Sequence, residues 1–506
     1  MKKNLARALS VLCASVMLLT VISGCSTAKT DNSGTATGDS STAAEAGTTA
    51  AATSTSGDTG KKEFANKTLD FYMFEGGYGK AAEEAIVAKF EETYGVKVNM
   101  VSSPKIGEIL RPKMISGMTP DVIMMNLNDS SGIVQALVKE KSILELTPML
   151  DEKALDSDST IRDTFLSGFL DCSFAVPYGD GKTYLLPLLY SPQGLIYNKD
   201  YFDKKGLQAP KTWDDFFALG EAAKKDGRAL FTYQGIYPSY LEIMLYPSIA
   251  SANGIEGYKK YVNYEEGSFK NDAVRQVLTN FQEISTKGYL LKGTTAMNHT
   301  QAQTAMMQGK ALFIPCGSWM EGEMKDAPRE DGFKFAMCPA PTLTAEGEQY
   351  ASVALDTVLI PKAAKNPELA TEFLKFLVTQ ESQKTFAEKA SGIEPIEGTL
   401  DLCKSIISES LYNFYAMFNG DVLPLVDSLK ALPDGCKVVT NDEIWVKPTS
   451  KVMNGQMTVD QWMEDVEKAF SQIREDFCKS GTTVRIILTG LVKERLPSPI
   501  LLQGSG

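Results

Sequence analysis

The chain has 506 residues and carries 51 Lys and Arg against 63 Asp and Glu, which gives a formal net charge of −12 at pH 7. Phosphate contacts require clustered Lys and Arg, so this acidity argues against a nucleic-acid partner. It also disfavours docking on an anionic membrane through a basic face. Roughly 415 residues, from 64 to 479, have a globular composition, which is too many for one core, so we expect two lobes.

The start of the chain has the pattern of an export signal that ends at Cys25. Lys2, Lys3 and Arg7 precede the apolar run 8–22, which is shorter than the roughly 20 residues that a membrane-spanning helix needs. Small residues directly before the Cys resemble the bacterial lipobox, in which that Cys receives lipid and becomes the mature N-terminus. We therefore expect a lipid anchor on the extracytoplasmic face of the cell membrane. An ordinary signal peptide with an incidental Cys is the alternative.

A polar linker, residues 25–63, follows the signal segment 1–24. Between residues 26 and 60 the chain is almost entirely Ser, Thr, Ala, Gly and Asp, without Val, Ile, Leu, Met or an aromatic residue. Such a segment cannot bury enough apolar surface to offset its ordering entropy, so we expect it to be disordered. As a flexible coil it would span about 30–35 Å, which is enough to hold a globular domain clear of a bilayer.

The first part of the globular region alternates between strands and helices. We expect strands at 68–74, 96–101 and 121–125, with helices at 80–94 and 111–117. This order, together with the continuous apolar run at 121–125, is typical of a doubly wound α/β domain. Ligands bind beyond the carboxyl ends of such strands, so residues 75–78 and 126–129 are expected to form the rim of a cleft.

The same alternation continues to the end of the globular region. Thr212 is a candidate N-cap for a helix that runs to residue 225, and the helix 367–379 is expected to continue through 383–389. The remaining expected elements are strands at 195–197, 311–315, 333–337 and 353–360, and a last helix at 461–477.

Six cysteines besides Cys25 remain after cleavage of the signal segment. An even number in an exported protein permits disulfides, and buried free thiols are an equally good interpretation. No pair has C-x-x-C spacing, so neither a zinc ribbon nor a redox pair is indicated, and we expect no metal and no cofactor. The six are Cys172, Cys316, Cys338, Cys403, Cys436 and Cys478.

A set of short motifs between residues 64 and 478 resembles the carbohydrate-binding lipoproteins of bacterial ABC importers. Each motif is weak alone, and their order and spacing behind a lipobox carry the resemblance. They are PDVI (120–123), GKTYLLP (181–187), GLIYNKDYF (194–202), PKTWDDF (210–216), GKALFIPCGSW (309–319) and NPELATEFLKFL (366–377). A finer likeness, to binders of N-acetylglucosamine and chitobiose, lies in YPSYLE (237–242), residues 300–303 and GSWMEGEMKDAP (317–328).

The resemblance implies a periplasmic-binding-protein-like α/β fold of two discontinuous lobes with a hinge between them. It implies that the chain crosses from one lobe to the other near 187–195, 353–360 and 396–399, and we call these segments the crossings. Lobe 1 is then 64–190 with a return at 356–397, and lobe 2 is 191–355 with hinge-side helices at 398–479. The tail 480–506 departs from the family pattern, and we interpret it as a non-native extension without function.

The candidate ligand-binding residues are those that the resemblance or the strand ends place at the cleft. A sugar presents apolar faces and hydroxyls, so its site needs aromatic side chains that stack on the sugar ring, together with carboxylates and amides. Polar groups that hydrogen-bond the hydroxyls give specificity. Trp319 is the first candidate, because the family places a stacking aromatic after this strand; a core Trp is the alternative. Trp213 opens a helix in a packing motif, and we interpret it as structural.

The other candidates are polar or aromatic residues near the expected strand ends and crossings. Turn or helix-cap roles are the alternative for the first four, and an acidic helix cap is the alternative for Glu321. The set comprises Glu75, Tyr78, Asn126 and Asn128 after the first and third strands, Tyr190 and Ser191 at the first crossing, Asp356 at the return and Glu321 after Trp319.

The expected function is capture of a sugar or oligosaccharide by a monomer that delivers it to the transmembrane subunits of an ABC permease. The competing class is an exported glycan-active enzyme. The only histidine, His299, lies in a polar, loop-like stretch, and neither G-x-S-x-G nor H-E-x-x-H occurs. Two carboxylates suffice for a glycosidase, so the acidic composition leaves that class open.

Overall fold

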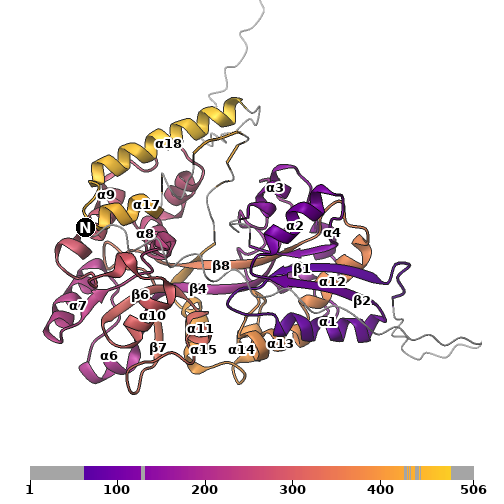
Figure 1. The fold of residues 1–506 in the computed structure, drawn as a ribbon, viewed down its shortest axis with the longest axis horizontal. Helices are drawn as coiled ribbons and strands as arrows, with labels where there is room; N and C mark the ends of the chain where they lie inside the picture. Colours follow the sequence, from indigo (N-terminus) through magenta and orange to yellow (C-terminus); the bar gives the residue numbers. More distant parts are fainter. Residues whose placement is uncertain are drawn as a thin grey trace, which may run out of the picture. The chain divides into compact units, whose positions relative to one another are not determined.

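The computed structural model describes residues 62–126, 131–426, 430, 432–433, 435–438, 444 and 446–479 (Figure 1). The expected signal segment, Cys25, nearly all of the linker, Asn128 and the tail 480–506 lie outside the described residues. Within the described part of the chain, no helix is long and apolar enough to cross a membrane.

Three parallel strands and one antiparallel strand form the sheet of the first lobe. β1 (Thr68–Phe74) pairs in parallel with β2 (Lys97–Ser103) and β3 (Val122–Met124), and β3 pairs with β8 (Gln349–Leu359) in the antiparallel sense. The sequence predicted β1 with these bounds because its β-branched and aromatic run ends at two glycines. β2 and β3 lie one or two residues from their predicted ends.

Helices of the first lobe bury one face each against this sheet or against one another. Phe71 of β1 meets Phe373 edge to face at 5.2 Å, and Phe90 meets the same ring at 5.0 Å, so the sheet, α1 and α12 share a core. The helices of this lobe are α1 (Ala81–Tyr94), α2 (Ile106–Ile115), α3 (Ile133–Lys139), α4 (Thr147–Leu150), α5 (Ile161–Thr164), α12 (Pro367–Leu377) and α13 (Gln380–Ala390).

Two helix predictions in this lobe were wrong in their extent. α2 begins at Ile106, five residues before the predicted start, and Pro112 lies inside it. The predicted continuation of α12 into 383–389 is instead a separate helix, α13. The side chain of Thr379 accepts a hydrogen bond from the amide of Ser382, and this N-cap starts α13 in a new direction.

Two long strands connect the lobes and lie side by side in Figure 1. β4 (Leu186–Asn198) pairs with β8 through its first half and with the strands of the second lobe through its second half. β8 pairs with β3 at its end and with β9 (Val422–Leu425) at its start. The predicted crossings near 187–195 and 353–360 thus fall in β4 and β8.

The second lobe is built on strands that follow β4. The sheet order continues from β4 to β6 (Ala311–Gly317) and then to β5 (Ala229–Phe231). β7 (Phe335–Cys338) also pairs with β4. Its helices are α6 (Lys199–Lys205), α7 (Trp213–Lys225), α8 (Glu242–Val262), α9 (Asp272–Thr286), α10 (His299–Met307), α11 (Met320–Glu323), α17 (Val446–Met453) and α18 (Val459–Lys479).

Several shorter elements and isolated bridges complete the described chain. Ile393 and Ile396 form isolated bridges with Tyr190 and Phe165, close to the predicted third crossing. The elements are α14 (Thr399–Cys403), α15 (Glu409–Ala416) and the 3₁₀ turns η1 (Pro238–Leu241), η2 (Thr294–Ala296) and η3 (Met417–Asn419).

Local sequence signals explain several of these elements. Thr212 and Asp215 form a reciprocal capping box at the start of α7, as the N-cap prediction requires. Trp213 is 3% exposed and packs against Phe216 and Phe281, which confirms its structural role. The indole of the buried Trp462 donates a hydrogen bond to a backbone carbonyl, which satisfies its polar atom inside the core.

Four of the six described cysteines are apolar core residues rather than cross-links. Cys172, Cys316, Cys338 and Cys403 are buried, and no disulfide joins any of the described cysteines. Burial raises the pKa of the Cys316 and Cys338 thiols to about 12 and that of Cys403 to about 11, so these thiols stay protonated at neutral pH.

Candidate functional site

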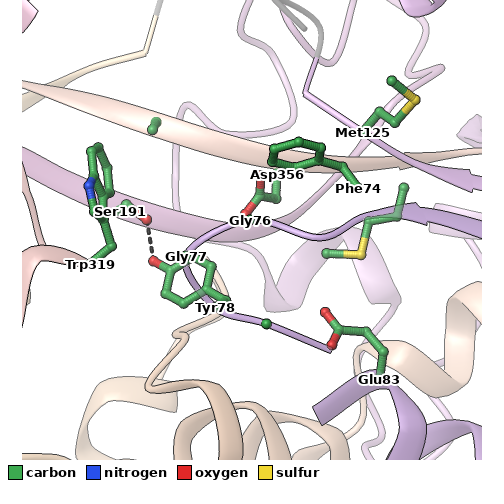
Figure 2. Close-up of a pocket in the computed structure, with 12 residues that line it drawn as sticks. Phe74, Gly76, Gly77, Tyr78, Glu83, Met125, Ser191, Trp319 and Asp356 are labelled. Atoms are coloured by element: carbon green, nitrogen blue, oxygen red, sulfur yellow. Dashed lines mark hydrogen bonds between the residues drawn. The ribbon is translucent and has the colours of Figure 1, made fainter. Parts of the chain in front are cut away.

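Two cavities lie next to each other where the loop after β1, strands β4 and β8 and the end of β6 meet. The first has a volume of about 140 Å³ and the second about 270 Å³. Trp319 and Ala354 line both, so the two cavities are halves of one cleft. The first cavity is lined by Phe74, Gly76, Gly77, Tyr78, Gly79, Glu83, Met124, Met125, Ser191, Trp319, Ala354 and Asp356 (Figure 2).

The loop after β1 forms one wall of the first cavity. Gly76 and Gly77 leave this wall without side chains, and the ring of Tyr78 follows them. The Tyr78 hydroxyl is hydrogen-bonded to the hydroxyl of Ser191 on β4 (Figure 2). Burial raises the pKa of Tyr78, so its hydroxyl stays protonated and able to donate.

Trp319 is held in place by the lack of a side chain at Gly317. A methyl group added at Gly317 would lie 2.0 Å from Cζ3 of the indole, so the ring lies directly against that backbone. One at Gly77 would lie 3.7 Å from Cβ of Trp319, which brings the β1 loop close to the indole. The Trp319 side chain is partly buried, and one part of it faces the cleft.

The first cavity also contains two carboxyl groups with perturbed acidity. Burial raises the pKa of Asp356 to about 6. It raises the pKa of Glu83 to about 7, and the nearby carboxylates of Asp356, Glu84 and Glu75 add to the shift. Removal from water disfavours the charged form of a carboxyl group, so both groups can exchange a proton near neutral pH.

The second cavity is richer in aromatic hydroxyls. Burial raises the pKa of Glu242 to about 7, although a hydrogen bond from Tyr246 opposes the shift. Asn126 donates a hydrogen bond from Nδ2 to the carbonyl oxygen of Leu355, at 2.8 Å. The lining comprises Asn126, Phe174, Gln193, Ser239, Tyr240, Glu242, Ile243, Tyr246, Tyr258, Trp319, Ser352, Val353, Ala354, Leu355, Leu425 and Val426.

Five of the residues predicted from sequence line the cleft. Tyr78, Ser191 and Asp356 line the first cavity, Asn126 lines the second and Trp319 lines both. They come from the loop after β1, the end of β3, β4, β8 and the end of β6, which the sheet order brings together. Asn128 lies outside the described residues, and its role stays a prediction.

Three predicted residues line neither cavity. Tyr190 is 4% exposed and meets Phe169 and Tyr415 edge to face, because neighbouring residues of a strand point to opposite sides and Ser191 takes the cleft side. Glu75 accepts a hydrogen bond from the hydroxyl of Ser102.

Glu321 is the third of these residues. It accepts a hydrogen bond at 2.6 Å from the hydroxyl of Ser410, which ties α11 to α15. Its carboxylate thus has a partner within the protein, and it lines neither cavity.

Two carboxyl residues that line the cleft were not predicted from the sequence. Glu83 is one of two adjacent glutamates in an ordinary amphipathic helix, and nothing local to it signals burial. Glu242 ends the YPSYLE motif that carried the finer family likeness, so that motif could have indicated it.

His299 does not lie in a loop, as predicted, but is the first residue of α10, which Asn298 caps. Its Nε2 lies 3.3 Å from Oε1 of Glu323, which also accepts a hydrogen bond from Gln303 through its other oxygen. Among the residues that the structure describes, no group of three or more His, Cys, Asp or Glu could hold a metal ion.

Comparison with known proteins shows the family of the chain. Residues 75–384 match the model of the bacterial extracellular solute-binding protein family, which covers more than half of the chain. The chain belongs to this family, as the resemblance seen in the sequence predicted.

Two relatives and one solved structure illustrate the relationship. The chain is 28% identical over 344 residues to the diacetylchitobiose-binding protein NgcE of Streptomyces coelicolor, covering 66% of this chain and 71% of that protein. It is 27% identical over 356 residues to a maltooligosaccharide ABC transporter solute-binding lipoprotein of Streptococcus pneumoniae, covering 66% and 73%.

The solved structure is that of RafE from Streptococcus pneumoniae in its apo form. It superposes with a TM-score of 0.64 at 19% identity and covers 82% of this chain and 99% of that chain. This likeness confirms the expected two-lobe α/β fold.

Proposed function

We propose that the protein is a lipid-anchored extracellular receptor of an ABC importer that captures an N-acetylated sugar, such as N-acetylglucosamine or diacetylchitobiose. The observation that carries this proposal is the cleft on both sides of Trp319. It combines an indole, several tyrosines, amides and carboxyl groups where the two lobes meet. Such a lining suits the apolar faces and hydroxyls of a sugar.

The charge of the cleft favours a ligand without phosphate or carboxylate groups. Among the described residues that line the two cavities there is no Lys, Arg or His. An acetamido group adds a methyl, a carbonyl and an N–H to the hydroxyls of a sugar, and aromatic and amide side chains can meet all three. The relative NgcE is a diacetylchitobiose-binding protein, which supports the same ligand class.

The proposed mechanism is capture followed by closure, without catalysis. One lobe binds the sugar, and rotation about β4 and β8 then buries it, which is a population shift driven by contacts available only in the closed form. The closed monomer would be recognised by the transmembrane subunits of a permease. The proposal keeps the lobe boundaries expected from the sequence, at residues 190, 355 and 397, and the first two of these residues belong to β4 and β8.

The proposed localisation is the outer face of the cell membrane, with Cys25 as the lipidated residue. The basic, apolar and small-residue pattern before Cys25 supports an export signal with a lipobox. A relative named as a lipoprotein supports the anchor.

The ligand class can be tested by thermal shift and calorimetry on the mature chain. A ligand that binds only the folded protein stabilises it by about 2.7 kcal/mol at one hundred times its dissociation constant. We expect N-acetylglucosamine or diacetylchitobiose to raise the melting temperature, with malto- and xylo-oligosaccharides as comparison ligands. A shift with another glycan alone would overturn the N-acetyl assignment. A shift only with an amino acid, peptide or metal would overturn the carbohydrate class.

A further inference from the structure

Three carboxyl residues are the ionisable acids among the polar residues that line the cleft. Glu83 and Asp356 line the first cavity and Glu242 lines the second, and the described lining residues include no cationic side chain to balance them. A neutral sugar would bring no positive charge to these three carboxyl groups. When these carboxyl groups ionise, no cationic side chain among the described lining residues balances their negative charge.

Glu83 has the clearest need for a hydrogen-bond donor among these groups. Its residue is 2% exposed, and its Oε2 atom has no hydrogen-bond partner in the protein. Figure 2 shows its carboxyl group pointing from α1 toward the strands that bound the first cavity. A buried acceptor without a donor costs free energy, which a donor on the ligand would recover.

The surroundings of Glu83 add negative rather than positive charge. The nearby acids are Asp356, Glu84 and Glu75, and all three disfavour its ionisation. Lys80 precedes the helix, but its ammonium group is ion-paired with Glu84 at 2.9 Å. The first cavity thus offers acceptors to a ligand atom that brings several donors.

We propose that the first cavity binds the protonated amino group of a glucosamine unit, so that the ligand is a partly deacetylated oligosaccharide of the proposed N-acetylglucosamine class. An ammonium group carries three donors and no acceptor, which matches Glu83 and Asp356. Hydrogen bonds between an ammonium group and a carboxylate are about twice as strong as neutral ones. An acetamido carbonyl at this place would instead bring a further acceptor toward two carboxyl groups.

The second cavity suits the acetylated unit of the same ligand. It is about twice as large as the first and is lined by Tyr240, Tyr246 and Tyr258, which can enclose an acetyl methyl group. Trp319 lies on both cavities, where it can contact both sugar rings. A disaccharide with one free amine and one acetamido group therefore fits the lining better than the fully acetylated form.

The test is calorimetry of the mature chain at pH 7 with diacetylchitobiose, the two monoacetylated disaccharides and the fully deacetylated disaccharide. We expect one monoacetylated form to bind about tenfold more tightly than diacetylchitobiose, equal to about 1.4 kcal/mol. Glu83→Gln should weaken binding of the amine-bearing ligand far more than binding of diacetylchitobiose, which abolishes the preference. Glu84→Gln is the matched control, because Glu84 is an exposed neighbour paired with Lys80, and it should keep the preference.

The inference rests on the proposed function, and the outcomes separate the two. Binding of diacetylchitobiose without any preference for an amine overturns the inference and leaves the proposed function standing. An equal loss for every ligand in Glu83→Gln assigns Glu83 to hydroxyl binding and also overturns it. Where Glu83→Gln does not fold, Asp356→Asn should show the same loss of preference, and its absence overturns the inference. No binding by any member of the series overturns both.

Discussion

The hydroxyl groups of Tyr78 and Ser191 are hydrogen-bonded to each other, across 113 positions of the sequence. The bond fastens the loop after β1 to β4 close to the point where β4 changes partners from β8 to β6. A wall of the first cavity is thereby tied to a strand that crosses between the lobes.

The first prediction concerns this bond. Tyr78→Phe removes one partner, and we expect the free energy of unfolding of the ligand-free protein to fall by about 1 kcal/mol. A double-mutant cycle with Ser191→Ala should give a coupling of about 0.5–1.5 kcal/mol in denaturant unfolding. Tyr178→Phe is the control, since the buried Tyr178 hydroxyl has no partner and its removal should cost little. Additive effects of Tyr78→Phe and Ser191→Ala would contradict the prediction.

The second prediction separates a ligand-binding indole from a core indole. Trp319→Ala should weaken sugar binding by about 10–200-fold, from the apolar area it would lose, with little change in the melting temperature of the ligand-free protein. Trp213 is the control, since it is 3% exposed in the core of the second lobe. Trp213→Ala should cost about 3–5 kcal/mol of stability. Unchanged affinity with a large stability loss in Trp319→Ala would show a core role instead.

The third prediction follows from the close approach of Gly317 to the Trp319 ring. An added Cβ would lie 2.0 Å from the indole, so Gly317→Ala must displace the ring from its place in the cleft. We expect at least about tenfold weaker sugar binding by calorimetry. Gly322→Ala is the matched control, because an added Cβ at Gly322 meets nothing within 4 Å. Equal affinities of the two variants would count against the role given to the indole.

Local sequence signals predicted several of the elements and some of the residues that line the cleft. Thr68–Phe74 could be predicted because its composition and the glycines after it both act locally, and Thr212 could be predicted from its spacing to Asp215. Trp319 lines both cavities and lies two residues after the end of β6, a strand that the sequence also indicated. These signals depend on residues within a few positions of one another.

The rest of the site depends on distant residues. Tyr190 and Ser191 differ only in which side of β4 they face, and the pairing with β8, over 160 residues away, decides this. Glu321 is engaged by Ser410, which no nearby pattern reveals. Glu83 is 2% exposed and lines a cavity together with residues from distant strands, such as Ser191 and Asp356. Its role could not be predicted from the helix alone.

The fourth prediction concerns the anchor, which lies outside the described residues. If Cys25 is lipidated, Cys25→Ala should release the protein from the membrane fraction or leave it unprocessed. Fractionation followed by intact-mass measurement checks both outcomes, because the lipid adds mass to the mature N-terminus. Cys478→Ala is a control, since Cys478 is exposed in α18 and far from the signal in sequence. A Cys25→Ala protein that stays fully anchored would contradict the assignment.

The last prediction is a pH dependence of stability that Glu83 causes. Burial raises its pKa to about 7, against an ordinary value of about 4.3 in an unfolded chain. Between these two values the folded protein binds more protons than the unfolded chain, so the contribution of Glu83 to stability is full below pH 4 and is lost as the pH rises through 7. The nearby acids Asp356, Glu84 and Glu75 also raise the pKa of Glu83.

Glu83→Gln removes this titration, so the variant should gain stability relative to the natural protein as the pH rises from 4.5 to 7.5. The expected relative gain is about 3 kcal/mol, from the size of the pKa shift. Denaturant unfolding of the ligand-free protein at several pH values measures it, and Glu84→Gln, at an exposed and ion-paired neighbour, should show a much smaller change. Because Gln keeps the shape of Glu and cannot ionise, a stability difference that is constant with pH would mean that Glu83 keeps an ordinary pKa and is solvated in the folded protein.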